Sequence, residues 1–316
     1  MLNNIQFLLY RFKYVYGKNL PLRVPVDVSM ELSSFCTNQC GYCYHGDPKK
    51  IPFTRGHMSF NLAKKIIVEA AELGVHSLKF NYRGEATMNP AFSLITKVAK
   101  ERARGSTFID RLTNSNFNFK HDREDIFEGL CNQTKVKVSF DSFIKEIFER
   151  QRKGSNYEKT IANIDKFYNY PGRDNELVIQ SVRTNLNKDE DLFHEIKKRW
   201  PEANASVRDC VEGRVEKDLS QTVVRHRDIS NRQSCTQAAV RLMIRHDGMV
   251  GPCCPSIKDE LTIGNANTEH LRDIFNSQIA KQLRKDLKTG KAFESDPCKN
   301  CSSFESFKGF KPSWKS

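Results

Sequence analysis

The sequence has no long uninterrupted apolar run. Its most apolar N-terminal stretch, IQFLLYRFKY, is interrupted by Arg11 and Lys13, whereas a membrane-spanning helix needs about 20 predominantly apolar residues. No small-residue cleavage site, of the kind that ends a secretory signal, follows this stretch. These absences predict a cytoplasmic protein without a membrane partner.

The sequence also has no internal repeat and no low-complexity segment of any length. Its 316 residues are 38% hydrophobic and 28% charged, which is typical of a globular protein. That length accommodates one large domain and a small one.

Ten cysteines are present, and in a cytoplasmic protein they favour metal binding or catalysis over a disulfide framework. Cys36, Cys40 and Cys43 lie in the stretch SSFCTNQCGYCYHGD with spacing C-x3-C-x2-C. Three thiolates can hold three irons of a cubane cluster and leave the fourth iron open. On spacing alone, zinc held by the same cysteines and His45 is the alternative.

Strand patterns alternate with helix patterns along the first two thirds of the chain. Strands are predicted at 26–33, 76–82, 107–113, 135–140, 176–182 and 204–210. Helices are predicted at 60–73, 90–103, 122–131 and 188–199, and a helical pattern also follows the strand at 135–140 and continues to 168. This order predicts parallel βαβ units, and six units favour a partial barrel of the TIM type. In such barrels the chemistry lies at the carboxyl ends of the strands, and the three cysteines directly follow the first one.

The flanking segments have a different pattern. An amphipathic helix is expected over 1–16, with Leu8, Phe12 and Tyr16 on one face. Residues 216–234 are polar and basic and predict a linker, VRLMIRHDGMVGPCC (240–254) predicts a hairpin, and 268–288 predicts one helix. The expected organisation is an N-terminal helical extension (1–23), a partial (β/α)6 barrel (24–215), and a small α+β domain with a basic tail (216–316).

Several motifs together resemble the radical S-adenosylmethionine (SAM) superfamily. The cysteine motif has an aromatic residue, Tyr42, before its last cysteine. YRGEATMNP (82–90) resembles the family's Gly-Gly-Glu-Pro motif, with Arg83 and Ala86 as departures. LTNSN (112–116) resembles the third-strand motif, and VSFDSF (138–143), followed by an Arg-x-Gly, resembles the fourth-strand segment.

The resemblance implies both a cofactor set and a reaction. Cys36, Cys40 and Cys43 would hold a [4Fe–4S] cluster whose open iron chelates SAM. A reduced cluster would cleave SAM to a 5′-deoxyadenosyl radical, which abstracts a hydrogen atom from the substrate. An external electron donor of the flavodoxin or ferredoxin type is implied as a partner. The protein supplies binding, orientation and exclusion of competing reactions.

The resemblance also implies which residues contact SAM. Each residue is assigned to one part of SAM by its position in a matching motif. The assignments are Gly84 and Glu85 for the amino group, Ser139 and Arg152 for the carboxylate, the Tyr42 backbone for adenine, and Asn114, Ser181 and Arg183 for ribose or substrate.

A second group of cysteines lies near the C-terminus. Cys235, Cys253, Cys298 and Cys301 form the pattern C-x12-G-x4-C followed by C-x2-C, which suits a closed tetrathiolate site for zinc or a [4Fe–4S] cluster. The pattern resembles the auxiliary-cluster domains called SPASM and twitch, as does IGNANTEHLRDIFNS (263–277). No cysteine follows Cys301, so the expectation is one auxiliary cluster ligated entirely by protein, as in the twitch form.

Three cysteines remain. Cys131 and Cys254 are expected to be structural. Cys210 ends the sixth predicted strand, where two roles are open: a buried small apolar residue, or a catalytic hydrogen-atom donor as in radical epimerases.

The leading hypothesis is a radical SAM oxidoreductase or isomerase. Its substrate would be a sugar or aminocyclitol-like molecule, a ribosomally made peptide, or a DNA- or nucleotide-linked group in DNA modification. The net charge of +13, with aromatic and basic residues interleaved at 10–18 and 307–315, suits a nucleic-acid surface or a merely solvated one. The rival classes are a zinc-stabilised binding protein and a SAM methyltransferase, the latter disfavoured because no glycine-rich loop follows the first strand.

Overall fold

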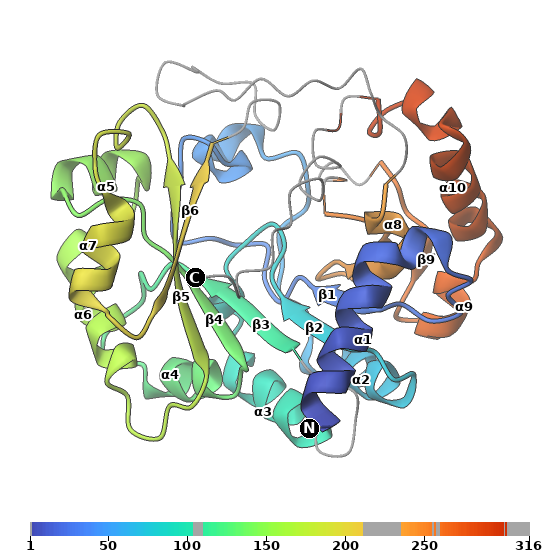
Figure 1. The fold of residues 1–316 in the computed structure, drawn as a ribbon, viewed down its shortest axis with the longest axis horizontal. Helices are drawn as coiled ribbons and strands as arrows, with labels where there is room; N and C mark the ends of the chain where they lie inside the picture. Colours follow the sequence, from blue (N-terminus) through green and yellow to red (C-terminus); the bar gives the residue numbers. More distant parts are fainter. Residues whose placement is uncertain are drawn as a thin grey trace.

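One nine-stranded sheet organises the chain (Figure 1). The computed structural model describes residues 2–103, 110–210, 235–254, 256, 260–299 and 301. The strand order is β6-β5-β4-β3-β2-β1-β7-β8-β9. The strands are β1 (Asp27–Met30), β2 (Ser77–Phe80), β3 (Asp110–Ser115), β4 (Lys135–Ser139), β5 (Glu176–Arg183), β6 (Asn204–Asp209), β7 (Arg241–Ile244), β8 (Met249–Gly251) and β9 (Gly264–Asn265).

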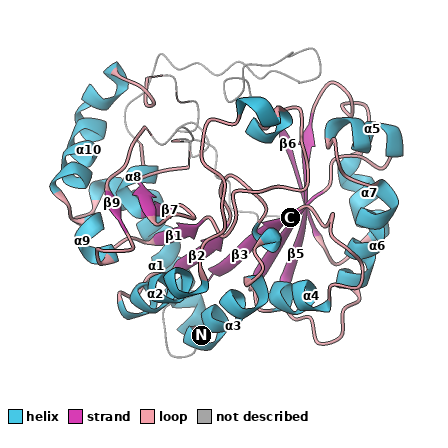
Figure 2. Ribbon diagram, turned by 180° about the vertical axis from the view of Figure 1, so that it is seen from behind, coloured by secondary structure: helices cyan, strands magenta, loops and turns pink. Residues whose placement is uncertain are grey.

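Helices cover the outer face of the parallel part of the sheet (Figure 2). Strands β1 to β6 pair in parallel in chain order, and a helix follows each strand as far as β5. The helices are α1 (Leu2–Tyr16), α2 (Phe60–Glu72), α3 (Phe92–Arg102), α4 (Glu124–Cys131), α5 (Lys145–Gln151), α6 (Tyr157–Tyr168), α7 (Leu192–Arg199), α8 (Gln237–Val240), α9 (Leu271–Phe275) and α10 (Gln278–Thr289). The predicted partial (β/α)6 barrel is therefore confirmed.

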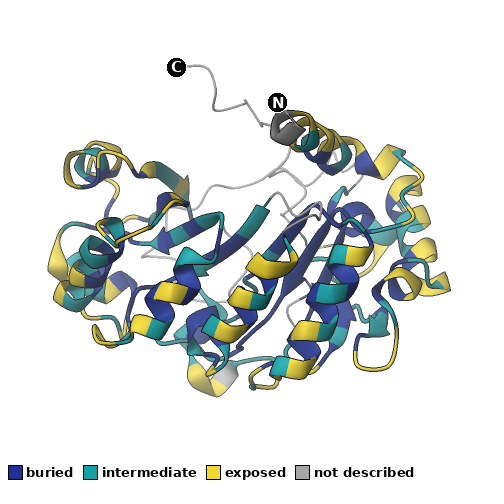
Figure 3. Cartoon of the chain, turned by 90° about the horizontal axis from the view of Figure 1, so that it is seen from below, coloured by how far each residue is buried: buried dark blue, intermediate teal, exposed yellow. Residues whose placement is uncertain are grey.

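The apolar core lies between the strands and these helices. Figure 3 shows buried strands and helices whose outward faces are exposed. Along β4, Val136 and Val138 are fully buried in this core, while Lys135, Lys137 and Ser139 alternate with them and are half-buried. Successive side chains of a strand point to opposite faces. The inner face of the curved sheet is therefore polar, and it is the face on which chemistry can be placed.

Helix α1 packs at the amino ends of β1 and β2. Tyr14 accepts a hydrogen bond from Arg241 Nη2 at 2.8 Å, and Arg241 Nε also donates to Asp27 Oδ1 at 3.1 Å. The predicted helix is present, but Leu8, Phe12 and Tyr16 are 66%, 51% and 52% exposed. The buried side carries Tyr10 and Tyr14 instead, which pack in a small apolar cluster with Val26, Ala239 and Val240, apart from the main core.

The C-terminal hairpin continues the same sheet. β7 pairs in parallel with β1 and antiparallel with β8, and Gly248 supplies the turn with a φ of 88°. The auxiliary region is thus hydrogen-bonded directly to the first barrel strand. The predicted hairpin is confirmed.

The prediction of one helix over 268–288 is wrong. α9 ends at Phe275, and α10 starts anew after Ser277, whose hydroxyl accepts from Ala280 N at 3.2 Å. Ile279 is 62% exposed, so the apolar face predicted for a single helix does not exist. Serine as an N-cap restarts the helix in a new direction.

Two predicted segments, the linker 216–234 and the basic tail 307–315, lie outside the described residues. Among the helices that are described, none combines the length and apolar content that a membrane crossing requires.

Candidate functional site

The loop that carries Cys36, Cys40 and Cys43 follows β1 and packs against the loop after β2. Gly84 makes this contact possible, because a Cβ there would lie 2.3 Å from the Ser33 carbonyl oxygen. The next residue, Glu85, donates its backbone N–H to the Phe35 carbonyl at 2.8 Å. The two loops are therefore tied together by backbone, and a side chain at position 84 would separate them.

Polar side chains from two other loops donate hydrogen bonds to the thiols. Asn116 Nδ2 lies 3.3 Å from Cys36 Sγ, and Arg152 Nη1 lies 3.9 Å from Cys40 Sγ. Burial raises the pKa of the Cys40 thiol to about 12, against the opposing effect of Arg152. Burial of this kind makes a thiolate costly unless cations neutralise it. Iron ions bound to the thiolates would do so, and the donors suit sulfur atoms that carry negative charge.

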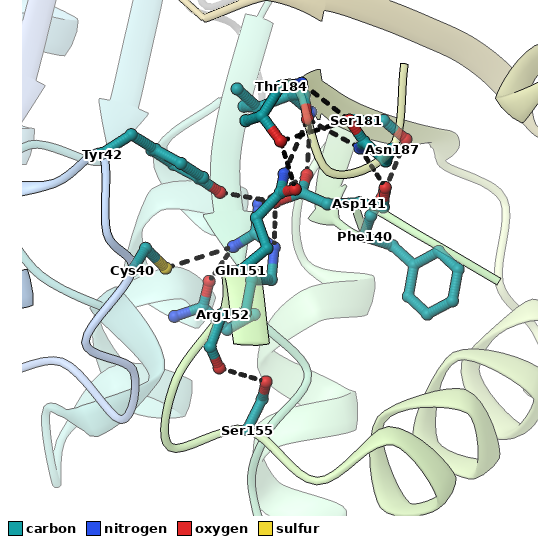
Figure 4. Close-up of polar contacts among 12 residues, drawn as sticks. Cys40, Tyr42, Phe140, Asp141, Gln151, Arg152, Ser155, Ser181, Thr184 and Asn187 are labelled. Carbon is teal, nitrogen blue, oxygen red and sulfur yellow. Dashed lines mark hydrogen bonds and ion pairs between the residues drawn. The ribbon is translucent and has the colours of Figure 1, made fainter. Parts of the chain in front are cut away.

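Asp141 organises the polar contacts around Arg152 (Figure 4). Its carboxylate is fully buried and accepts from Arg152 Nη2 at 3.0 Å, from the Tyr42 hydroxyl at 2.5 Å, and from Val182 N at 2.8 Å. Arg152 Nε also lies 2.8 Å from Asp141 Oδ2. The arrangement fixes the cysteine loop, through Tyr42, to the ends of β4 and β5.

Asn116 joins this network to Glu85. Its side chain contacts Cys36 and accepts from Arg152 Nη1 at 3.3 Å, and its backbone N–H donates to Glu85 Oε2 at 2.8 Å. Glu85 Oε1 accepts from the Thr87 hydroxyl at 2.7 Å. Burial raises the pKa of Glu85, while the hydrogen bonds from Thr87 and Asn116 oppose this rise. A cationic group beside this carboxylate would stabilise its charged form.

The other residues predicted to contact SAM differ in their burial and in the partners that they have within the chain. Ser139 is half-buried at the end of β4, and Asn114 has a buried Oδ1 without a hydrogen-bond partner. The Ser181 hydroxyl donates to the Phe140 carbonyl at 2.5 Å. Arg183 is exposed and pairs with Asp209 at 2.6 Å. Ser181 and Arg183 thus already have partners within the chain.

Cys210 directly follows β6 and is buried, with 9% of its surface exposed. Its backbone N–H donates to the Arg183 carbonyl at 2.9 Å. The structure therefore puts it at the carboxyl end of the barrel strands, on the edge strand β6.

His45, the candidate fourth ligand for zinc, has another partner. Its Nε2 lies 2.7 Å from the Arg83 carbonyl oxygen. Because a carbonyl only accepts, this nitrogen donates a proton and is not available to a metal ion. Within the described parts of the chain, no three His, Cys, Asp or Glu side chains are arranged around a single metal ion. In a cubane cluster each thiolate binds a different iron.

Arg83 replaces the first glycine of the resembled motif, and the structure shows its role. Its Nε and Nη2 donate to the two oxygens of Glu31 at 2.7 and 2.8 Å. Burial would raise the pKa of Glu31, but hydrogen bonds from Arg83 and His246 outweigh it and lower the pKa. His246 follows β7, so this bidentate ion pair connects the loop after β2 to the C-terminal hairpin.

The second group of cysteines gathers beyond β7 and β8. Burial raises the pKa of the Cys253 thiol, and the nearby charges of Cys254, Cys235 and Cys298 raise it further. Cys235 is affected in the same way, by burial first and then by Cys301 and Cys254. The four predicted ligands are therefore close enough to act on one another electrostatically, although among the described residues no three of them are placed to hold a single metal ion. Cys254 accepts from Arg241 Nη1 at 3.8 Å.

Sequence reasoning missed the residues that link the site together. Asp141 and Asn116 both lie inside motifs that had been singled out, but they were not chosen as site residues. Asn116 is two residues beyond the predicted Asn114 and therefore on the same side of the chain. Asp141 could have been identified in the same way, because it lies two residues after the predicted Ser139. Nothing in the local pattern indicated the pairing of Glu31 with Arg83.

Known proteins resemble the chain in both regions. Residues 235–302 match the SPASM iron-sulfur cluster-binding domain. The S-adenosyl-L-methionine-dependent 2-deoxy-scyllo-inosamine dehydrogenase of Niallia circulans is 37% identical over 54 residues, which are 17% of this chain and 22% of that protein. The aligned part therefore spans about a fifth of that curated relative.

Solved structures resemble nearly the whole chain. BtrN in complex with AdoMet and 2-DOIA has a TM-score of 0.57 at 16% identity, covering 88% of this chain and 93% of that one. anSMEcpe with bound AdoMet has a TM-score of 0.64 at 18% identity, covering 90% and 88%. Streptococcus suis SuiB bound to precursor peptide SuiA has a TM-score of 0.58 at 14% identity, covering 90% and 71%.

The match to the SPASM domain spans the second group of cysteines, and the structural likeness to BtrN and anSMEcpe covers 88% and 90% of the chain. The resemblance inferred from the motifs is thus confirmed: the chain has the fold of the radical SAM enzymes and carries a SPASM-type iron–sulfur cluster-binding domain at residues 235–302.

Proposed function

We propose that the protein is a radical SAM enzyme that abstracts a hydrogen atom from its substrate, with net oxidation, epimerisation or isomerisation as the outcome. The observation that carries the proposal is the loop of Cys36, Cys40 and Cys43, two of whose thiols accept hydrogen bonds from Asn116 and Arg152. When bound there, a reduced [4Fe–4S] cluster supplies the electron that cleaves SAM to a 5′-deoxyadenosyl radical. The electron would come from a flavodoxin- or ferredoxin-type donor.

The chain's own residues would bind and orient SAM beside the thiols. Gly84 and Glu85 lie against the cysteine loop, where a buried carboxylate suits an ammonium group. Arg152 and Ser139 are the proposed partners of the SAM carboxylate. Because Asp141 already holds Arg152 on two nitrogens, that guanidinium is pre-oriented.

The proposal is tested by anaerobic reconstitution with iron and sulfide. A reductant and SAM should then yield 5′-deoxyadenosine and methionine, measured by chromatography. A colourless zinc protein that leaves SAM intact would contradict it and would favour the zinc-stabilised binding class.

Replacing Glu85 with Gln should weaken SAM binding. The substitution keeps the shape and the contact with Thr87 but removes the charge that would hold the SAM ammonium. The expected loss is about 1.5–3 kcal/mol of binding free energy, the range for a hydrogen bond to a charged group. Isothermal titration of the reconstituted protein with SAM measures it.

A matched control for this variant is Glu128→Gln on helix α4, which changes the same charge far from the cysteine loop. Equal SAM dissociation constants for wild type and Glu85→Gln would remove Glu85 from the binding site.

We further propose that an auxiliary [4Fe–4S] cluster binds to Cys235, Cys253, Cys298 and Cys301, so that each of its four irons has a cysteine ligand. Full ligation favours electron transfer from a substrate radical, or a structural role, over direct coordination of substrate. Cys210, at the end of β6, would donate a hydrogen atom if the outcome is epimerisation.

Losing one auxiliary ligand should remove iron and loosen the C-terminal region, because metal binding supplies folding free energy to small domains. Cys298→Ala should therefore lower the iron content and increase cleavage by protease within 235–301. Cys131→Ser is the control, since Cys131 lies at the end of α4. Full iron content and unchanged protease resistance in Cys298→Ala would show that the assignment is wrong.

Three substrate classes stay open under this proposal: a sugar or aminocyclitol-like molecule, a group linked to a nucleotide or DNA, and a ribosomally made peptide. The likeness to BtrN favours the first, and the likeness to SuiB favours the third as a second candidate function. Incubation of the reconstituted enzyme with SAM, reductant and each class, followed by mass spectrometry for hydrogen gain or loss, distinguishes them.

A further inference from the structure

The inner face of the barrel carries a lysine that the proposed chemistry does not use. Lys137 lies in β4 between Val136 and Val138, which point into the apolar core. Its side chain therefore points to the inner face. It is half-buried, and none of the residues that the structure describes forms an ion pair or hydrogen bond with its ammonium group.

Its electrostatic neighbours come mainly from other strands of the sheet. The pKa of Lys137 is lowered to about 8, first by burial and then by the charges of Arg208, Lys135 and Lys79, while Asp110 weakly opposes the shift. Arg208 is in β6, Lys79 in β2 and Asp110 in β3. Lys79 and Asp110 belong to the neighbouring strands of the same ladder, whereas Arg208 is exposed on the edge strand β6.

Two of these neighbouring cations already have counter-ions. Lys79 pairs with Asp27, and Lys135 pairs with Glu176 at 2.8 Å. Arg208, like Lys137, has no ion pair among the described residues. Arg208 is exposed, so solvent screens its charge, but a half-buried ammonium group without a counter-ion, such as that of Lys137, raises the free energy of the fold. A ligand with negative charge would offset that cost.

A second polar group on the same face lacks a partner. Asn114 lies directly opposite Lys137 in the β3–β4 register, and its buried Oδ1 accepts no hydrogen bond from the part of the chain that the structure describes. An orphaned buried acceptor costs free energy until a donor reaches it. The ligand that suits both groups bears an acidic oxyanion and, next to it, a hydroxyl or N–H donor.

We propose that Lys137, with Asn114 beside it, binds an oxyanion of the substrate, a phosphate or a carboxylate, on the inner face of the barrel. The inference rests on the proposed function and specifies the substrate class of the same site. Lys137 precedes Ser139 by two residues, which is about 7 Å along a strand. A free aminocyclitol, being a cation, is disfavoured.

The test measures acylation of Lys137 in the reconstituted holoenzyme. Succinimidyl propionate at pH 8 acylates neutral amines and releases N-hydroxysuccinimide rather than acetate, and peptide mass spectrometry gives the rate for each lysine separately. Inorganic phosphate and acetate serve as the two probes. At a concentration ten times its dissociation constant, the probe that fits should slow acylation of Lys137 about tenfold. Lys145, exposed and paired with Glu158 on the helical side, is the internal control and should not change.

The two arms distinguish a phosphate site from a carboxylate site. Protection by phosphate alone points to a phosphorylated or nucleotide-linked substrate, and protection by acetate alone points to a carboxylic acid. Lys145→Met should leave the protection of Lys137 intact in either case. If neither probe slows acylation of Lys137 more than that of Lys145, the proposal is overturned. Formation of 5′-deoxyadenosine from SAM in the same preparation reports separately on the proposed function.

Discussion

Replacing Cys36, Cys40 and Cys43 together with Ala should abolish formation of 5′-deoxyadenosine from SAM. The three thiols are the only cysteines on the loop after β1, and without them no iron can be held beside Glu85. The auxiliary cysteines lie beyond β7 and β8, so about half of the iron should remain if each group holds one [4Fe–4S] cluster. Iron analysis and chromatography of the reaction mixture measure both effects.

The control is a triple variant that spares this loop, Cys131→Ser with Cys210→Ser and Cys254→Ser. It should retain SAM cleavage, although Cys210→Ser would change the product if Cys210 donates a hydrogen atom. SAM cleavage at the wild-type rate without the three loop cysteines would disprove the assignment. Loss of all iron would instead show that the two cysteine groups depend on each other.

The sequence predicted the fold well where apolar periodicity was strong. Every strand from β1 to β6 lies within or beside its predicted range, because the alternation of buried strands and amphipathic helices is a local property. The prediction failed over 268–288, where Ser277 caps a new helix. It also misjudged which face of α1 is buried, since Tyr10 and Tyr14 pack in a small apolar cluster with Val240, which lies far away in the sequence.

The site was predictable only as far as its motifs. The cysteine spacing identifies the loop, but the contacts that hold the loop in place join residues far apart in sequence. Tyr42 reaches Asp141, and Arg83 reaches Glu31 and thereby His246. Such pairs depend on the register of the strands, which one sequence alone does not reveal. The inner-face position of Lys137 likewise follows from the alternation of β4 only once the curvature of the sheet is known.

Replacing Asp141 with Ala should cause the largest loss of stability among single substitutions in the site. The carboxylate is fully buried and accepts from Arg152, Tyr42 and Val182 N. Its removal leaves the guanidinium of Arg152 buried without a counter-charge. Breaking a buried ion pair in this way costs about 3–5 kcal/mol. Urea unfolding of the anaerobic holoenzyme, followed by the fluorescence of the buried Trp200, measures the change.

The matched control is Asp125→Ala, which breaks an ion pair with Arg123 on the protein surface. Those two side chains are 48% and 43% exposed, and solvent-exposed pairs contribute about 0–1 kcal/mol. A double variant, Asp141→Ala with Arg152→Met, should recover part of the stability because no buried charge is left unpaired. It should not recover SAM binding if Arg152 contacts the SAM carboxylate as proposed. Equal stability losses for Asp141→Ala and Asp125→Ala would show that the buried network does not hold the cysteine loop in place.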